Sequence, residues 1–210
     1  MLTDPMPTEA VETAHKQVRL AAEDLDGSRV ATLMLEFADA WGVPALWEQV
    51  CRPLLVQLSG RTAAEIAVER ALCEGVRVGL DVYRREPGRS LPTGGVLLAG
   101  AEKEAHSLGL HALAAALRER GRGCLHLGPA LPWSALTSAV HRAVPRTVVL
   151  WSQTPVTGRA YRLVRFARDF PLLRVYGAGP GWIEPLARPA RRLGTLSAAV
   201  DVCLDATRQR

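Results

Sequence analysis

The sequence is poor in the residues that mark several classes of protein. Only four of its 210 residues are cysteines, and no two of them form a C-x-x-C pair, so neither a zinc site nor a disulfide framework is indicated. No apolar run is long enough to span a bilayer, and the first residues lack the basic and apolar regions of a signal peptide. We therefore expect a cytoplasmic protein without a membrane segment.

Lysine is also scarce. Lys16 and Lys103 are the only two lysines, the other 24 basic residues are arginines, and the formal net charge is +5. A charge of this size permits an acidic partner without requiring one. Hydrophobic residues make up 48% and charged residues 22%, which is ordinary for a folded globular chain and argues against disorder.

The first 88 residues carry apolar side chains at helical spacing. A helix is expected from Thr8 to Asp24, with Gly27 ending it. Three further apolar stripes run over Val30–Trp41, Trp47–Leu58 and Ile66–Tyr83. Four helices with short connections predict an antiparallel bundle. The charged and then Pro- and Gly-rich stretch 84–95 is typical of a linker, so we expect a bundle over 1–88 and a second domain over 94–210.

The second domain alternates short β-type runs with helical segments. The expected strands are 96–99, 123–127, 147–151, 172–176 and a weak run near 192–196, and the expected helices are about 105–120, 133–144, 158–169 and 197–208. Such alternation predicts right-handed βαβ units and a parallel sheet. The expected fold class is α+α/β: a four-helix bundle followed by a flavodoxin-like, Rossmann-type sheet of five parallel strands.

Ligands of such sheets bind beyond the carboxyl ends of the strands, at the switch point between strands one and three. Segments 100–109, 152–158 and 177–182 should therefore meet at one edge. Strands one and three are not followed by the Asp of a phosphoacceptor site, and a Walker loop is absent. The glycine run from Gly177 follows the fourth strand and contains Pro180, so it is a weak match to a dinucleotide fingerprint.

The segment Glu104-Ala105-His106-Ser107-Leu108-Gly109 follows the first strand. A neutral imidazole is a strong nitrogen ligand for a transition metal. A carboxylate two residues away can take the other ring N–H and fix the tautomer. Gly109 removes a side chain where a bulky ligand would press on the next helix. The alternative is an ordinary exposed histidine near a helix N-terminus.

The pattern Glu104-x-His106-x-x-Gly109 resembles the D/E-x-H-x-x-G signature of cobalamin-binding domains. The resemblance implies that His106 is the lower axial ligand of cobalt. It also implies that the displaced nucleotide tail of cobalamin enters the crevice between strands one and three. The helical bundle before the sheet is also the family's arrangement, with the corrin held between the two parts.

Two further pairs match that family in order. Ser152 and Thr154 stand where it has Ser and Thr after strand three, and Gly177 and Gly179 stand where it has a Gly pair after strand four. Both pairs also have a simpler interpretation, because Ser and Thr commonly cap a βα turn and glycines make turns.

The likeness is greatest to the sensory half of MerR-type regulators of the CarH and LitR kind, through Leu127-Gly128-Pro129, 149–153 and 179–182. It implies a stand-alone regulatory protein that binds cobalamin, senses it or senses light through it, and acts on transcription through a protein partner. A homo-oligomer is also compatible with the sequence. No nucleophile–base set is visible, so we expect no independent catalysis. The alternatives are a corrinoid carrier for a methyltransferase and a cofactor-free interaction module.

The chain departs from those regulators in the bundle. Glu69 matches the Glu of their W-x9-E-H motif, but Arg70 replaces the His and Ser59 falls near the Trp position. An arginine has no free lone pair for a metal, so a second His ligand from this position is excluded. Glu69 itself, on an apolar stripe, either faces the corrin or lies at a partly exposed rim.

Direct DNA binding is expected to be weak or absent. Residues 1–28 are too few for a winged helix–turn–helix, and the arginines at every third position from Arg159 to Arg168 predict a solvated helix face. Of the five tryptophans, Trp133 and Trp182 are expected to pack at the surface.

Overall fold

The computed structural model describes residues 5–59, 62–85 and 91–208, with the side chains of the last helix described as far as Asp205. The chain divides into two compact units, Met1–Pro87 and Gly88–Arg210. Residues 86–90 of the expected linker lie outside the described residues. None of the helices in the described ranges combines the length and the apolar character needed to cross a membrane.

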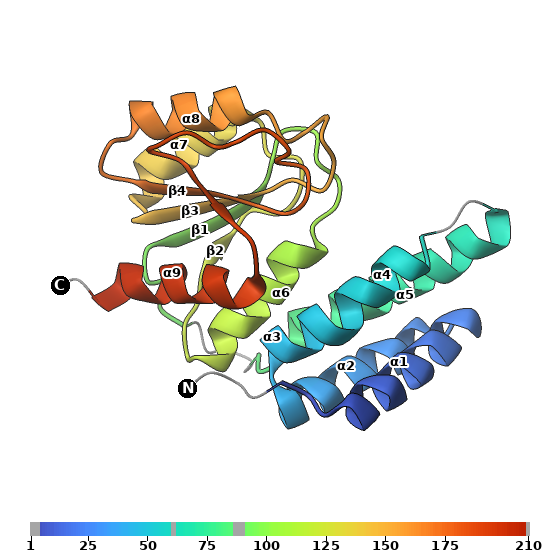
Figure 1. Cartoon of the computed structure of the whole chain (residues 1–210). Coiled ribbons are helices and arrows are strands. Elements are labelled where there is room, and N and C mark those ends of the chain that lie inside the picture. Colours follow the sequence, from blue (N-terminus) through green and yellow to red (C-terminus); the bar gives the residue numbers. More distant parts are fainter. Residues whose placement is uncertain (1–4, 60–61, 86–90, 209–210) are drawn as a thin grey trace. The chain divides into compact units, whose positions relative to one another are not determined.

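The first unit is helical. It contains α1 (Thr8–Glu23), α2 (Gly27–Trp41), a run made of α3 (Val43–Leu46), one π-helical stretch (Trp47–Cys51) and α4 (Arg52–Gln57), and then α5 (Ala63–Val82). Figure 1 shows α1, α2, α4 and α5 lying alongside one another. The four expected helical segments are therefore present. The segment expected over Trp47–Leu58 is not one regular helix, because it belongs to a longer run that contains a π-helical stretch.

The prediction that Gly27 ends the first helix is wrong, because Gly27 begins α2. Leu25 takes a φ of 56° and makes the turn. The side chain of Asp26 then accepts a hydrogen bond from the backbone N–H of Arg29 at 2.8 Å and caps α2. The start of α5 is fixed in a similar way by a capping box between Thr62 and Glu65.

The second unit is a parallel sheet between helices, which confirms the predicted fold class. Its strands are β1 (Val96–Gly100), β2 (Leu125–His126), β3 (Thr147–Trp151), β4 (Arg174–Ala178) and β5 (Arg191–Leu193), in the order β2-β1-β3-β4-β5. The helices are α6 (Leu108–Glu119), α7 (Trp133–Ala143), α8 (Ala160–Asp169) and α9 (Leu196–Arg208). Figure 1 shows α7 and α8 on one face of the sheet and α6 and α9 on the other.

Two element boundaries differ from expectation for physical reasons. The fourth strand begins at Arg174, not residue 172, because Leu172 lies in the preceding turn and is 97% exposed. The first helix of this unit begins at Leu108. The residues before it form a loop, in which Lys103 has a φ of 68° and Glu104 is turned inward.

The sheet core is apolar on both faces. Leu97, Ala99, Val148, Leu150 and Val175 face α7 and α8, and they form one cluster of buried side chains with residues of those helices. The cluster includes Trp182, which is fully buried, so its expected surface position is wrong. The indole N–H of Trp182 donates to the carbonyl of Ala178 at 2.9 Å, which satisfies the polar atom in the core.

Candidate functional site

The loop after β1 places a carboxylate where three loops meet. The side chain of Glu104 is 1% exposed, although carboxylates are rarely buried without partners. Its Oε2 atom accepts hydrogen bonds from the backbone N–H groups of Gln153 at 2.8 Å and Thr154 at 3.2 Å, and from Oγ1 of Thr157 at 2.5 Å. The carbonyl of Glu104 accepts the N–H of Ala130 at 2.8 Å. Glu104 therefore links the loops after β1, β2 and β3.

The other carboxylate oxygen of Glu104 binds His106. Oε1 accepts the backbone N–H of His106 at 2.9 Å and lies 2.6 Å from its Nδ1. Burial by itself would raise the pKa of Glu104, but the hydrogen bonds from Thr157, His106 and Gln153 outweigh it and lower the pKa to about 2. The carboxylate is thus ionised at neutral pH and can only accept.

This pairing sets the chemistry of the imidazole. Because the carboxylate of Glu104 accepts, Nδ1 of His106 must carry the proton of the neutral ring. The lone pair is then on Nε2, which has no hydrogen-bond partner among the described residues. The side chain of His106 is 61% exposed. The site therefore offers an oriented imidazole nitrogen at the surface, backed by a buried carboxylate, which is the arrangement of a metal-ligating histidine.

Sequence reasoning missed Thr157. Its Oγ1 donates to Glu104 and also lies 2.7 Å from Oγ of Ser152 and 3.2 Å from Oγ1 of Thr154. The only signal was its place in the loop after β3, three residues beyond Thr154. That spacing suits a turn in which the N–H of Thr157 reaches the carbonyl of Thr154 at 3.1 Å.

Ser152 and Thr154 are brought to the site, where both take part in the hydrogen bonds of the loop after β3. Ser152 is fully buried, and its hydroxyl donates to the carbonyl of Thr154 at 3.0 Å. Thr154 uses its backbone N–H to hold Glu104. Both residues therefore order the loop after β3.

An indole fills the space beside Gly109. Trp151 is the last residue of β3, and a Cβ atom added to Gly109 would lie 2.4 Å from Cη2 and from Cζ3 of Trp151. A Cβ added to Gly179, whose φ is 97°, would lie 3.1 Å from Cδ2 of the same ring. The bulky group expected against Gly109, in the first turn of α6, is therefore a side chain of this protein, the indole of Trp151. We call the space between Gly109 and Gly179 that holds this ring the indole site.

Gly177 does not belong to the indole site. An added Cβ there would meet Leu186, Trp182 and Leu163 at 2.9–3.1 Å, so this glycine makes room for the core on the α8 face. Gly179, besides bordering the indole site, and Gly181 let the loop after β4 approach the loop after β3. An added Cβ would lie 2.3 Å from the carbonyl oxygen of Ser152 at Gly179 and 2.3 Å from Oγ of Ser152 at Gly181. The glycine run is thus needed for close packing between the loops after β3 and β4.

The bundle residues singled out in the sequence both lie on α5. Glu69 is half-buried and Arg70 is exposed. Half-burial of Glu69 is compatible with both of its interpretations, a side chain facing the corrin and one at a partly exposed rim. Cys73, one turn later, has its pKa raised to about 11 by burial and by the charge of Glu69, against the opposing effect of Arg70.

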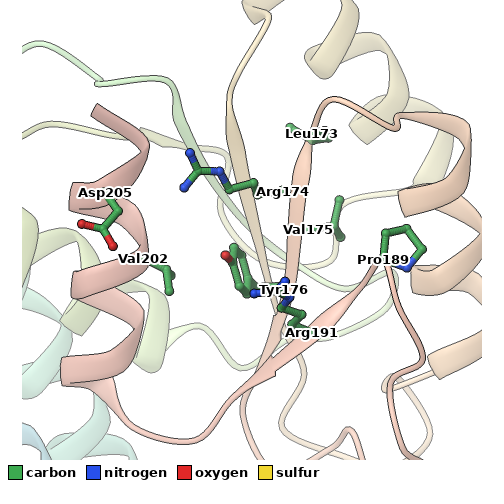
Figure 2. A pocket seen from close by; sticks show the side chains of 8 residues that line it. All are labelled: Leu173, Arg174, Val175, Tyr176, Pro189, Arg191, Val202 and Asp205. Carbon is green, nitrogen blue, oxygen red and sulfur yellow. The ribbon is translucent and has the colours of Figure 1, made fainter. Parts of the chain in front are cut away.

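A cavity of about 470 Å³ lies at the other end of the sheet. Its polar groups come from Arg174, Tyr176, Arg191 and Asp205, at the start of β4, on β5 and on α9 (Figure 2). None of its lining residues belongs to the loop that carries His106. The cavity and the Glu104–His106 pair are therefore separate features of this unit.

The basic helix α8 keeps its apolar residues inside. Ala160, Leu163, Val164, Phe166 and Ala167 are buried. The outer positions are held by Tyr161, Arg162, Arg165, Arg168 and Asp169. Arg162 forms an ion pair with Glu102 of the β1 loop at 2.7 Å.

The comparisons with known proteins concern the fold. No protein-family model and no curated protein sequence matches the chain. Among solved structures, the chain is similar to a chain in the crystal structure of the methanol:cobalamin methyltransferase complex MtaBC from Methanosarcina barkeri. The identity is 15%, the TM-score is 0.49, and the match covers 98% of this chain and 86% of the other. It is also similar to a cobalamin-binding protein from Desulfitobacterium hafniense DCB-2, with 14% identity, a TM-score of 0.47, and coverage of 90% and 96%. Likenesses of this size do not by themselves indicate a shared ligand.

Proposed function

We propose that this chain is a corrinoid-binding protein in which Nε2 of His106 ligates the cobalt from below. The observation that carries the proposal is the pairing of a surface imidazole with a buried, ionised carboxylate. Nδ1 of His106 and Oε1 of Glu104 are 2.6 Å apart, and the carboxylate is held by Thr157, Gln153 and Thr154. A neutral imidazole is a suitable ligand for cobalt, and the carboxylate raises its donor strength.

The position of the pair supports the same proposal. His106 follows β1, which neighbours β3 on one side and β2 on the other. That is the switch point where ligands of doubly wound sheets bind. A planar macrocycle can approach His106 from solvent, since its side chain is mostly exposed. The D/E-x-H-x-x-G pattern in the sequence stands at this same place.

The residues present fit the metal end of a corrinoid, but they do not fit its nucleotide tail. The expected crevice for that tail holds the indole of Trp151, packed between Gly109 and Gly179. We therefore assign the binding to His106 and Glu104, with Thr157, Ser152 and Thr154 ordering them. A bound corrinoid would supply a cobalt centre that can carry an alkyl group, and this chain's residues would hold it without a catalytic step of their own.

The role that we propose for the bound state is regulatory. On this hypothesis the chain senses cobalamin, or light through it, and passes the state to a protein partner that acts on transcription. The alternative is a corrinoid carrier that presents its cobalt to a methyltransferase.

Reconstitution tests the binding proposal. Purified apoprotein is mixed with hydroxocobalamin, methylcobalamin or adenosylcobalamin in darkness, free corrinoid is removed by gel filtration, and the visible spectrum of the protein fraction is recorded. We expect retained corrinoid with a spectrum shifted from that of the free compound. Complete loss of all three compounds on gel filtration would contradict the proposal.

The two roles differ in what the loaded protein does next. A sensor changes its oligomeric state or its binding to a partner when adenosylcobalamin is illuminated. A carrier keeps the same oligomeric state on illumination. When a methyltransferase is added, the methyl group of its bound methylcobalamin is transferred to a thiol. Light scattering before and after illumination, beside a methyl-transfer assay, separates them.

A further inference from the structure

Trp151 packs against Gly109, in the segment that carries the proposed cobalt ligand. Side chains alternate along a strand, and the neighbouring Leu150 faces α7 and α8, so Trp151 faces the side of α6. There its six-membered ring lies against Gly109, in the first turn of α6, and its ring junction lies against Gly179. His106 is three residues before Gly109 in the same segment. The indole site therefore lies near the switch point between β1 and β3, and one of the residues that border it, Gly109, closely follows the proposed ligand in the chain.

The backbone around the indole site is held by three loops. The carbonyl of Trp151 accepts the N–H of Ala101 after β1 at 2.8 Å, and the carbonyl of Ser152 accepts the N–H of Gly181 after β4 at 2.9 Å. A Cβ on Gly109 would collide with the ring, whereas one on Gly179 would collide with the carbonyl oxygen of Ser152 at 2.3 Å and would also lie close to the ring at 3.1 Å. The space is therefore shaped to hold a flat fused ring, and this protein fills it with one of its own.

The polar atom of the ring is not used. Nε1 of Trp151 is buried and has no hydrogen-bond partner among the described residues. Buried indole N–H groups usually find a partner, and leaving one unpaired opposes folding. By contrast, the indole of Trp182 in the same unit donates to Ala178. The indole ring of Trp151 is therefore held by packing and not by a hydrogen bond to a described residue, so the shape of the ring is what this position uses.

The lower base of cobalamin has the same kind of shape. It is a benzimidazole, a five-membered ring fused to a six-membered ring like an indole, and it is carried on the nucleotide tail. When a protein imidazole takes the lower position on cobalt, that base is displaced and needs a place outside the coordination shell. One ring system can occupy the indole site at a time, because interiors are close-packed.

We infer that Trp151 is a specificity-determining residue that takes the place of a fused-ring base and keeps the nucleotide tail of a corrinoid out of the sheet. The inference rests on the proposed function in that it concerns the same ligand. It implies that the wild-type chain gains nothing from the tail. Cobinamide, which lacks the nucleotide, should bind as well as cobalamin.

Paired binding measurements test this inference. Dissociation constants for aquocobalamin and diaquocobinamide are measured for wild type, Trp151→Ala and Trp151→Leu. We expect wild type to bind the two compounds within about threefold of each other, and Trp151→Ala to prefer cobalamin by about tenfold or more because the vacated space takes the base. Trp133→Ala is the matched control, since Trp133 packs on the α8 face, and it should behave like wild type.

A measurement without corrinoid separates this inference from the proposed function. Free 5,6-dimethylbenzimidazole should raise the Tm of Trp151→Ala and leave the Tm of wild type unchanged, while imidazole, a single ring, should affect neither protein. If no variant binds corrinoid but the base stabilises Trp151→Ala alone, the proposed function fails and the assignment of the indole site stands.

Two results would overturn the inference while leaving the proposed function intact. One is a wild-type chain that binds cobalamin about tenfold or more tightly than cobinamide, which needs no variant to fold. The other is a free base that binds wild type and Trp151→Ala equally, or neither, while both retain corrinoid.

Discussion

Oε1 of Glu104 and Nδ1 of His106 lie 2.6 Å apart, and the two side chains have opposite environments: the carboxylate is 1% exposed and the imidazole 61%. The buried partner is fixed by neighbouring loops, so it orients the exposed one. Most of the hydrogen bonds to the carboxylate of Glu104 come from the loop after β3. The direction of one imidazole therefore depends on how two separate loops pack together.

The ionised state of Glu104 should appear in the acid stability of the apoprotein. Its pKa is lowered to about 2 in the folded chain from an ordinary value of 4.5. The stability that this contributes, on the order of 3 kcal/mol, is fully present above pH 4.5 and is lost as the pH falls from 4.5 towards 2. We expect Glu104→Gln to be less stable than wild type at pH 7, with a much smaller difference at pH 3, in urea unfolding followed by circular dichroism. Glu102→Gln is the control, because Glu102 is a partly exposed ion-pair residue, and it should change little at either pH. A pH-independent loss in Glu104→Gln would contradict the account.

Thr157 should matter through its hydroxyl rather than its shape. Thr157→Val removes the Oγ1–H that donates to Glu104 while keeping the branched side chain. We expect it to lower the free energy of unfolding by about 1.5–3 kcal/mol, the range for a hydrogen bond to a charged group. Thr157→Ser retains the hydroxyl and should lose less. Equal stability of the Val variant and wild type would show that the hydroxyl does not hold the carboxylate.

Two cysteine thiols should be unreactive in the folded chain. Burial raises the pKa of Cys51 and of Cys203 to about 12, so almost no thiolate is present at pH 8. With a disulfide reagent at pH 8, we expect both residues to remain unlabelled in native protein and to react rapidly in guanidinium chloride. Peptide mapping identifies the labelled sites. Fast native labelling of either cysteine would mean that it is not enclosed as described.

The contact between α2 and α5 should tolerate no added methyl group. A Cβ on Gly75 would lie 2.5 Å from Cβ of Val30 and 2.6 Å from the carbonyl oxygen of Gly27. Alanine favours a helix by about 1 kcal/mol over glycine, yet we expect Gly75→Ala to lower Tm because overpacking costs roughly 1–3 kcal/mol. Gly194→Ala is the matched control, since an added Cβ there meets nothing within 4 Å. A raised Tm in Gly75→Ala would contradict the close packing.

The sequence predicted the fold class because its patterns are local. Apolar stripes in the first unit and alternating strands and helices in the second follow from the periodicity of side chains. Boundaries failed where a single local contact decided them. Asp26 caps α2 one residue before the glycine that was expected to end a helix, and the exposed Leu172 delays β4.

The site was predictable only in part. Glu104 and His106 are two residues apart, so their pairing could be expected from sequence. The contribution of Thr157 depends on two loops meeting across 53 residues, which no local pattern records. The contact between Gly109 and Trp151 could not be predicted for the same reason, because Gly109 lies in α6 and Trp151 is the last residue of β3.

The identity of the nitrogen bound to cobalt decides whether His106 holds the corrinoid. The wild-type chain is loaded with cobinamide, which has no base of its own, and the cobalt is reduced to the divalent state for electron paramagnetic resonance. With natural histidine we predict a triplet splitting from one axial nitrogen, which becomes a doublet when the protein carries ¹⁵N-labelled histidine. The splitting should vanish in His106→Ala and persist in His141→Ala, where His141 is an exposed residue of α7. Absence of nitrogen splitting in the loaded wild type, or its persistence in His106→Ala, would contradict the assignment of His106 as the cobalt ligand.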